Sequence, residues 1–265
     1  MDRADFVHLL SPAGQQLLAR AGEFEDRTDV VKMVSSLRAE GHDAGLVAAI
    51  LTQVNLRRRA RAKFGEFAKH MLFTEDGLEQ ATRLQVSAIH AGRFQSAGIK
   101  QVADLGCGIG SEAMALASLD INVVAYEIDE VTAAVATYNL AAFQNAEVRL
   151  GDVTEVDLTQ FEALFFDPAR RHLDGQGSTR RKFDPANYSP NYDFVLQSAR
   201  LKPTGVKLGP GQKHEHIPED AEAVWLSMDG DLVELTLWFG ALARPEVKRA
   251  ALLLAPSGAV ELTSA

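Results

Sequence analysis

The chain has 265 residues, of which 46% are hydrophobic and 24% are charged, so it can bury one large core or two modest ones. The formal net charge of −9 argues against a protein that coats nucleic acid nonspecifically. The single cysteine, Cys107, can form no intramolecular disulfide, which fits a reducing cytoplasm. No apolar run approaches the ~20 residues that cross a bilayer, and the N-terminus lacks an apolar signal core, so a cytoplasmic protein without a membrane partner is expected.

Residues 1–98 are expected to be helical and to form an N-terminal helical domain, because apolar residues recur there at helical spacing. Four stretches are expected to be helices: residues from 12 onward after the Ser11-Pro12 start signal, 28–41, 45–69 and 78–94. No low-complexity linker follows these helices. We therefore expect them to pack on the second domain, residues 99–265.

The second domain alternates short apolar runs with helical segments, which is typical of an α/β fold with a mostly parallel sheet. Seven strands are expected: 101–105, 122–127, 146–150, 163–167, 205–208, 232–238 and 249–255. The turn signal Asp229-Gly230 also allows residues 224–226 to pair with 232–238.

A glycine-rich loop follows the first predicted strand. Glycine occupies every second position, at Gly106, Gly108 and Gly110, which lets the backbone turn tightly and approach a ligand closely. The dinucleotide fingerprint would require a further glycine at position 111, where the chain has Ser111. A dehydrogenase is therefore a distant alternative.

Carboxylates stand at the ends of four predicted strands. Glu127 follows the first glycine by about 20 residues, the spacing at which an acid meets the ribose hydroxyls of an adenosine cofactor. Asp152 lies just past the third strand, where an adenine amino group would need an acceptor. Together with Asp104 and Asp167, these acids are expected along the carboxyl edge of the sheet, where open α/β sheets bind ligands.

On these motifs the chain resembles the class I, Rossmann-like methyltransferases that depend on S-adenosylmethionine (SAM), across roughly residues 75–255. It is similar more narrowly to bacterial methyltransferases with a THUMP-like C-terminal domain, in segments 63–64, 71–74, 77–82 and 167–171. Those relatives continue past position 265. The resemblance therefore implies either a natural short form or a truncated product that lacks most of the THUMP-like domain.

The resemblance implies SAM as the cofactor, with a carboxylate two residues before the first glycine facing its cationic methionine end. The segment 77–82 would cover that methionine end. The cofactor-binding residues expected on this basis are Gln80, Thr82, Asp104, Gly106, Cys107, Gly108, Gly110, Glu127, Ile128, Asp152 and Val153.

Asp167-Pro168 is similar to the [DN]-P-P-[YFW] motif of amino methyltransferases, which makes these two the predicted catalytic residues. In that motif an acidic or amide oxygen and a backbone carbonyl accept hydrogen bonds from an exocyclic amine, so that the nitrogen lone pair is aligned. Ala169 and Arg170 replace the second proline and the aromatic residue. Stacking on a base would then have to come from a downstream aromatic residue: Phe183, Tyr188 or Tyr192. The alternative is that Asp167-Pro168 only ends a strand.

Two other chemistries are disfavoured by the sequence. Methyl transfer to C5 of a pyrimidine normally needs a thiolate nucleophile, and Cys107 lies inside the glycine loop, where it cannot also reach a substrate. His214 and His216 form a close histidine pair, but no acidic or thiol partner stands at ligand spacing, so solvated histidines are expected rather than a zinc site.

Two basic runs stand out in the chain. The first, Arg57, Arg58, Arg59, Arg61 and Lys63, fits either a solvated helix face or a polyanion contact. The second run flanks Asp167-Pro168, and its position favours polyanion contact; it consists of Arg170, Arg171, Arg180, Arg181 and Lys182. The predicted substrate-binding residues are Arg170, Arg171, Arg180, Arg181 and Tyr188.

The function expected from these observations is SAM-dependent N-methylation of a base in RNA, with tRNA or rRNA as the partner and no metal. Two alternatives stay open. One is a module that binds SAM or RNA without catalysis, and the other is a methyltransferase acting on a small molecule or a protein.

Overall fold

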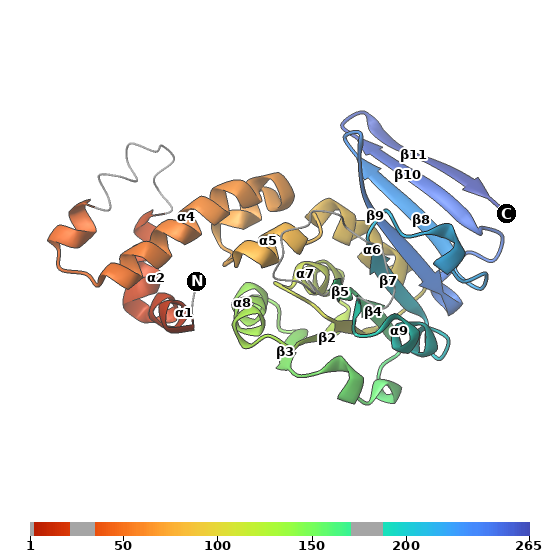
Figure 1. Cartoon of the computed structure of the whole chain (residues 1–265), viewed down its shortest axis with the longest axis horizontal. Helices are drawn as coiled ribbons and strands as arrows, with labels where there is room; N and C mark the ends of the chain where they lie inside the picture. Colours follow the sequence, from red (N-terminus) through yellow and green to blue (C-terminus); the bar gives the residue numbers. More distant parts are fainter. Residues whose placement is uncertain (1–2, 22–34, 171–187) are drawn as a thin grey trace.

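The computed structural model describes residues 3–21, 35–170 and 188–265 (Figure 1). N-terminal helices form a lobe at one end of the molecule, and a sheet with helices on both faces forms the rest (Figure 1). The lobe includes α1 (Arg3–Leu10), α2 (Pro12–Ala21) and α4 (Ala44–Phe64). The predicted helix 28–41 is described only from residue 35 onward, where it is helical and ends before Gly41, which has φ 82°.

Local capping explains where these helices begin. The Ser11 hydroxyl accepts a hydrogen bond from the Gly14 N–H at 3.1 Å, which confirms the predicted start of α2. The Asp43 carboxylate accepts from the N–H groups of Gly45 and Leu46, at 2.9 and 3.1 Å, and so caps α4. Buried residues of all three helices belong to one apolar cluster that continues into the sheet. The lobe therefore packs on the sheet, as expected, and the boundary at residue 98 stays a prediction.

The single helix expected over residues 78–94 is wrong. The structure has two helices there, α5 (Glu75–Gln80) and α6 (Leu84–Ser96), separated by a link of extended backbone at residues 81–83. In place of a continuing helix, lysine side chains donate hydrogen bonds to the backbone carbonyls of residues 78–81, and so satisfy acceptors that a helix end leaves open.

The described part of the chain has a nine-stranded sheet in the order β11-β10-β8-β9-β7-β4-β1-β2-β3. The strands are β1 (Gln101–Leu105), β2 (Asn122–Glu127), β3 (Ala146–Leu150), β4 (Ala163–Phe166), β7 (Thr204–Leu208), β8 (Glu222–Met228), β9 (Asp231–Phe239), β10 (Arg249–Ala255) and β11 (Gly258–Ser264). The five strands from β3 to β7 in this order are mutually parallel, and β9 is antiparallel to both of its neighbours. The expected mostly parallel α/β sheet is confirmed.

The expected number of seven strands is wrong. The pairing of 224–226 with 232–238 is confirmed, but it makes residues 222–228 a full strand, β8. Strand 249–255 then pairs with β8, and β11 pairs with 249–255 and extends the sheet further. Every residue of β11 is exposed, although Val260 and Leu262 alternate with polar residues, so this strand packs no apolar face on the core.

Each sheet face is covered by its own helices. On one face α6, α7 (Ser111–Ser118) and α8 (Glu130–Leu140) share a cluster with side chains such as Val102 and Phe165. On the other face α9 (Tyr192–Ala199) shares a second cluster with Leu105 and Phe166. Because side chains alternate along a strand, Asp104 and Asp167 point to the same face as Phe165, toward α6 and α7.

A small two-stranded sheet lies directly after β4. It pairs β5 (Ala169–Arg170) with β6 (Tyr188–Ser189) in antiparallel register. This pairing brings the chain on either side of residues 171–187 together, immediately beyond Asp167-Pro168.

Candidate active site

The glycine loop between β1 and α7 has the backbone geometry that its sequence predicts. Gly106, Gly108 and Gly110 all have positive φ, at 91°, 56° and 90°. The N–H groups of Gly106 and Cys107 both donate to the Tyr126 carbonyl, at 3.0 and 2.9 Å, which holds the loop against the end of β2. A Cβ atom on Gly106 would lie 3.0 Å from the Asp167 carbonyl oxygen, whereas a Cβ on Gly108 would meet open space. The loop therefore closes against β4 and leaves room above Gly108.

Glu127 is fixed at the end of β2 by three backbone donors. Its carboxylate accepts from the N–H of Gly108 at 3.0 Å, and from those of Ile128 and Asp129 at 2.8 and 3.0 Å. The side chain is only partly buried. A carboxylate offers about four acceptor sites, so an oriented Glu127 can still accept from vicinal hydroxyls.

Asp104 is the most unusual group of the site. It is fully buried, and neither carboxylate oxygen has a hydrogen-bond partner of ordinary geometry among the described residues. Burial first, and then the neighbouring Glu112 and Asp167, raise the pKa of Asp104 well above its usual value. An unpartnered buried carboxyl group beside an open glycine loop fits a cationic ligand, such as the ammonium of SAM.

Asp152 and its neighbours follow β3, next to the end of β2. One Asp152 oxygen accepts from the Thr154 N–H at 2.9 Å and begins a short 3-10 helix, Val153–Glu155. Val153 is buried, whereas the Ile128 side chain is 65% exposed. The structure thus places these residues along the expected edge. Their contacts with adenine stay predictions.

Asp167 is paired with a residue that the sequence analysis did not select. The Lys207 ammonium lies 2.5 Å from Asp167 Oδ2 and donates to the Gln80 carbonyl at 3.3 Å. Lys207 follows Val206, which is in register with Phe166, so the two partners end neighbouring strands. A single lysine in an apolar strand does not by itself indicate a functional residue. The pairing of β4 with β7 is what places Lys207 beside Asp167. Pro168 is buried beside this pair.

A second buried ionic group lies on the same face of the sheet, beneath Asp104 and Asp167. His90 of α6 contacts Glu112 through Nδ1 at 3.1 Å and Glu234 of β9 through Nε2 at 2.8 Å. Burial lowers the pKa of His90, but the two carboxylates outweigh it and raise this pKa to about 10. His90 is therefore an imidazolium at neutral pH. Sequence reasoning missed this group because its members are far apart in the chain.

Gln80 and Thr82 lie at the junction of α5 and α6. Gln80 is the last residue of α5 and is exposed, while Thr82 lies in the extended link and is 6% exposed. The contact of the Gln80 carbonyl with Lys207 connects this junction to Asp167. The structure thus brings both residues near the strand ends, and their role at the methionine end of the cofactor stays a prediction.

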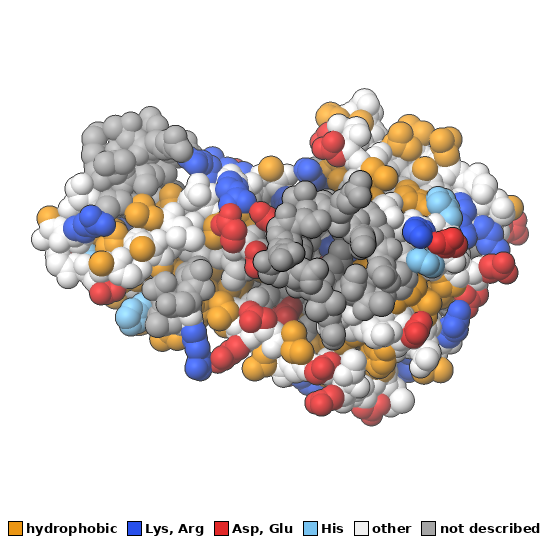
Figure 2. Space-filling model, in the orientation of Figure 1, with side chains coloured by type: hydrophobic (Ala, Val, Ile, Leu, Met, Phe, Trp, Pro, Cys, Tyr) orange, Lys and Arg blue, Asp and Glu red, His pale blue; other side chains and the backbone are white. Residues whose placement is uncertain are grey.

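The first basic run is largely engaged within the chain. Arg57 donates to the Met71 carbonyl at 2.8 Å, and Arg59 pairs with Glu75. Lys63 donates to carbonyls of the α5 end at 2.7–2.8 Å. Figure 2 accordingly shows blue and red side chains intermixed where α4 meets α5. These contacts lie within the chain, and neither of the two open interpretations, a solvated helix face or a polyanion contact, predicted them.

The second basic run cannot be placed in the same way. Arg171, Arg180 and Arg181 lie outside the described residues, and of Arg170 only the backbone, in β5, is described. The Tyr188 ring is 4% exposed and packs on the Tyr192 ring at 5.9 Å between centroids, and the Tyr188 hydroxyl donates to Gln212. Contact of Tyr188 with a base stays a prediction.

Neither the Cys107 thiol nor the His214 and His216 pair has the surroundings of a reactive or metal-binding group among the described residues. Burial, then Asp104 and Glu127, raise the pKa of the Cys107 thiol well above its usual value, which disfavours a thiolate. His214 stacks on Trp225 at 4.9 Å. Within residues 3–21, 35–170 and 188–265, no group of three or more His, Cys, Asp or Glu side chains is placed to hold a metal ion. No helix among them is long and apolar enough to cross a membrane.

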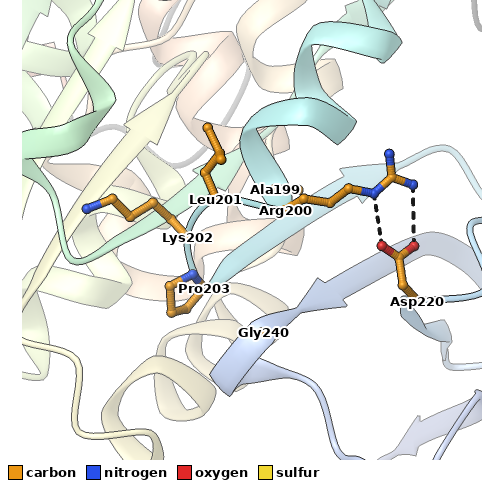
Figure 3. A pocket seen from close by; sticks show the side chains of 7 residues that line it. All are labelled: Ala199, Arg200, Leu201, Lys202, Pro203, Asp220 and Gly240. Atoms are coloured by element: carbon orange, nitrogen blue, oxygen red, sulfur yellow. Dashed lines mark hydrogen bonds and ion pairs between the residues drawn. The ribbon is translucent and has the colours of Figure 1, made fainter.

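A surface cavity of about 530 Å³ lies elsewhere, around the start of β7 (Figure 3). Its lining includes Pro203, just before β7, and Gly240, just after the antiparallel β9, which places it at the amino edge of the parallel strands. The Arg200–Asp220 ion pair, at 2.9 Å, borders it. The cavity is thus at the edge opposite the glycine loop.

The parallel strand order, the glycine loop and the carboxylates at the strand ends fit a class I, SAM-dependent methyltransferase domain, a class whose cofactor is SAM. A family model described as "Methyltransferase small domain" matches residues 66–178. A second model, "Domain of unknown function (DUF8688)", matches residues 2–60.

Comparison with known proteins agrees with this assignment. Two curated relatives, from Mycobacterium tuberculosis strains CDC 1551 / Oshkosh and ATCC 25618 / H37Rv, are described as uncharacterized SAM-dependent methyltransferases. Each is 35% identical over 208 residues, which cover 75% of this chain and 56% of the relative. The chain thus spans just over half of their length. The crystal structure of a candidate methyltransferase from Porphyromonas gingivalis W83 has a TM-score of 0.63 at 19% identity, covering 91% of this chain and 66% of that one, and supports the fold.

Proposed function

We propose that this chain transfers a methyl group from SAM to a nitrogen of a base in RNA, with tRNA or rRNA as the substrate. The observation that supports this most is the position of Asp167: its backbone carbonyl lies against Gly106 of the glycine loop, and its carboxylate interacts with Asp104 and is held by Lys207. SAM supplies an electrophilic methyl group on a sulfonium that is already a good leaving group. The protein therefore needs to position a nucleophile and does not need a strong base.

Each residue of the site has a distinct task in this proposal. Asp167 accepts hydrogen bonds from the protons of the target amine, so that the nitrogen lone pair is held in one direction. Asp104 accepts from the ammonium group of the cofactor, whose positive charge would lower the raised pKa of this carboxyl group. Glu127 accepts from the ribose hydroxyls of the cofactor. The assignment of Asp104 is supported by its full burial, with no hydrogen-bond partner of ordinary geometry for its carboxylate oxygens among the described residues.

RNA is proposed as the substrate on the basis of charge near Asp167. The second basic run follows Asp167-Pro168 along the sequence. The β5–β6 pairing holds residues 169–170 and 188–189, on either side of this segment, next to each other just after Asp167-Pro168. Cationic side chains near a reacting centre attract a polyanion even in a chain of net charge −9.

The proposal is tested with tritiated SAM and three acceptors: total RNA, RNase-treated extract and total protein. We expect label in RNA that RNase removes and protease leaves. Label that survives RNase but not protease would exclude RNA as the substrate. Binding of SAM without transfer to any acceptor would favour the module without catalysis. Glu219→Ala, a change to an exposed residue just before β8 at the opposite edge, serves as the control variant.

A further inference from the structure

Lys207 connects two parts of the site that are far apart in the sequence. Its ammonium contacts Asp167 Oδ2 at 2.5 Å and the Gln80 carbonyl at 3.3 Å. The lysine side chain is 13% exposed and the Asp167 side chain 31%. One oxygen of Asp167 is thus engaged from the protein side, and a good part of the carboxylate still faces outward, where a substrate can approach.

The same ammonium belongs to a pair of lysines that hold the end of α5. Lys63 of α4 donates hydrogen bonds to the carbonyls of Leu78, Glu79 and Ala81, at 2.8, 2.7 and 2.7 Å. Lys207 of β7 donates to the carbonyl of Gln80. Cations at a helix C-terminus satisfy carbonyls that lack helical partners. Burial first, and then the nearby Lys207, lower the pKa of Lys63 to about 8, so the two ammonium groups are close enough to interact. The link between α5 and α6 is therefore tied to both the N-terminal lobe and the sheet.

The charges around Asp167 explain why it needs a cation. Asp104, Glu112 and Glu234 face this region from β1, α7 and β9, and His90 of α6 pairs with Glu112 and Glu234. Lys207 is the cation in contact with Asp167 itself. Burial raises the pKa of Asp167, and Lys207 opposes that rise. A protonated Asp167 would present a donor to the amine, which is the wrong polarity for an acceptor.

We propose that Lys207 is a positioning residue for methyl transfer, because its ammonium orients the Asp167 carboxylate and couples this acceptor to the α5–α6 link. The inference rests on the proposed function for its role in catalysis. The geometry that it invokes can be tested without any substrate.

The first experiment follows the titration of Asp167 by carboxyl ¹³C NMR, with the resonance assigned from Asp167→Asn. In Lys207→Met we expect the pKa of Asp167 to rise by about one unit or more, since an opposite charge at this distance shifts a carboxyl group by ~1–3 units. Lys207→Arg should retain most of the wild-type value. An unchanged titration in Lys207→Met would overturn the proposal.

Lys202→Met is the matched control. The Lys202 ammonium also donates to two backbone carbonyls, those of Thr159 and Phe161 at 3.0 and 2.8 Å, but at the opposite edge of the sheet, beside the cavity of Figure 3. This variant should leave the Asp167 titration unmoved. If Lys207→Met does not fold, the reciprocal measurement is made in Asp167→Asn, where the pKa of Lys207 should fall. A Lys207 titration equal to that of the wild type would again overturn the proposal.

The second experiment measures transfer from tritiated SAM to total RNA as a function of pH. In Lys207→Met we expect kcat to fall about tenfold or more, and the acid limb of the profile to move to higher pH. Lys207→Arg should restore both. An unmoved acid limb in an active Lys207→Met enzyme would contradict the proposal. A wild-type enzyme that labels no RNA while its Asp167 titration depends on Lys207 would contradict the proposed function alone.

Discussion

Glu127→Ala is the most direct test of the cofactor site. The change removes a carboxylate that accepts from the N–H groups of Gly108, Ile128 and Asp129, and with it the proposed acceptors for the ribose hydroxyls. Without these acceptors the two ribose hydroxyl donors are unsatisfied, which weakens the free energy of SAM binding by about 1–3 kcal/mol. This corresponds to a roughly 5- to 150-fold weaker Kd. S-adenosylhomocysteine should lose as much, because it has the same ribose.

Calorimetric titration of SAM and S-adenosylhomocysteine into the wild type and the variant measures this loss. Glu219→Ala, which changes an exposed glutamate at the opposite edge of the sheet, should bind both ligands like the wild type. A thermal unfolding curve for each protein checks that the glycine loop has not simply collapsed. Equal affinity of Glu127→Ala and the wild type for both ligands would refute the assignment of Glu127.

Three further predictions follow from the site. Gly108→Val should abolish SAM binding in the same titration, because its branched side chain would occupy open space above a loop position with φ 56°. Asp167→Ala should keep the SAM affinity within a few-fold but lower the methylation rate by roughly two decades or more, whereas Asp167→Asn should retain more activity because its amide oxygen still accepts; near wild-type turnover of the alanine variant would end the proposed mechanism. Because the pKa of His90 is raised from 6.5 to about 10 by Glu112 and Glu234, its stabilising charge is fully present below pH 6.5 and is lost as pH rises toward 10. The free energy of unfolding should fall over this range by up to about 1.4 kcal/mol per pH unit, and a urea titration series in which His90→Gln has the same slope as the wild type would contradict this.

The strands were predictable because their signals are local. Apolar runs at 101–105, 122–127 and 146–150 each form a strand with the predicted bounds, and the glycine loop has the positive φ values that its glycines allow. Residues 258–264 pair only at the edge of the sheet and contribute no buried apolar side chain, so the core gave no reason to expect them. Where a single helix was expected over 78–94, carbonyls of the α5–α6 junction accept from Lys63 and Lys207, which are distant in the sequence.

The sequence by itself determined the α/β class, the position of the glycine loop and the row of acids at the strand ends. These follow from periodicity, from the conformational freedom of glycine and from the rule that parallel strands end at one edge. Only the tertiary structure decided that Lys207 meets Asp167 and that His90 joins Glu112 to Glu234. Buried charges are stable only when distant parts of the chain supply partners, and the register of β4, β7 and β9 that brings these partners together is set by packing between elements.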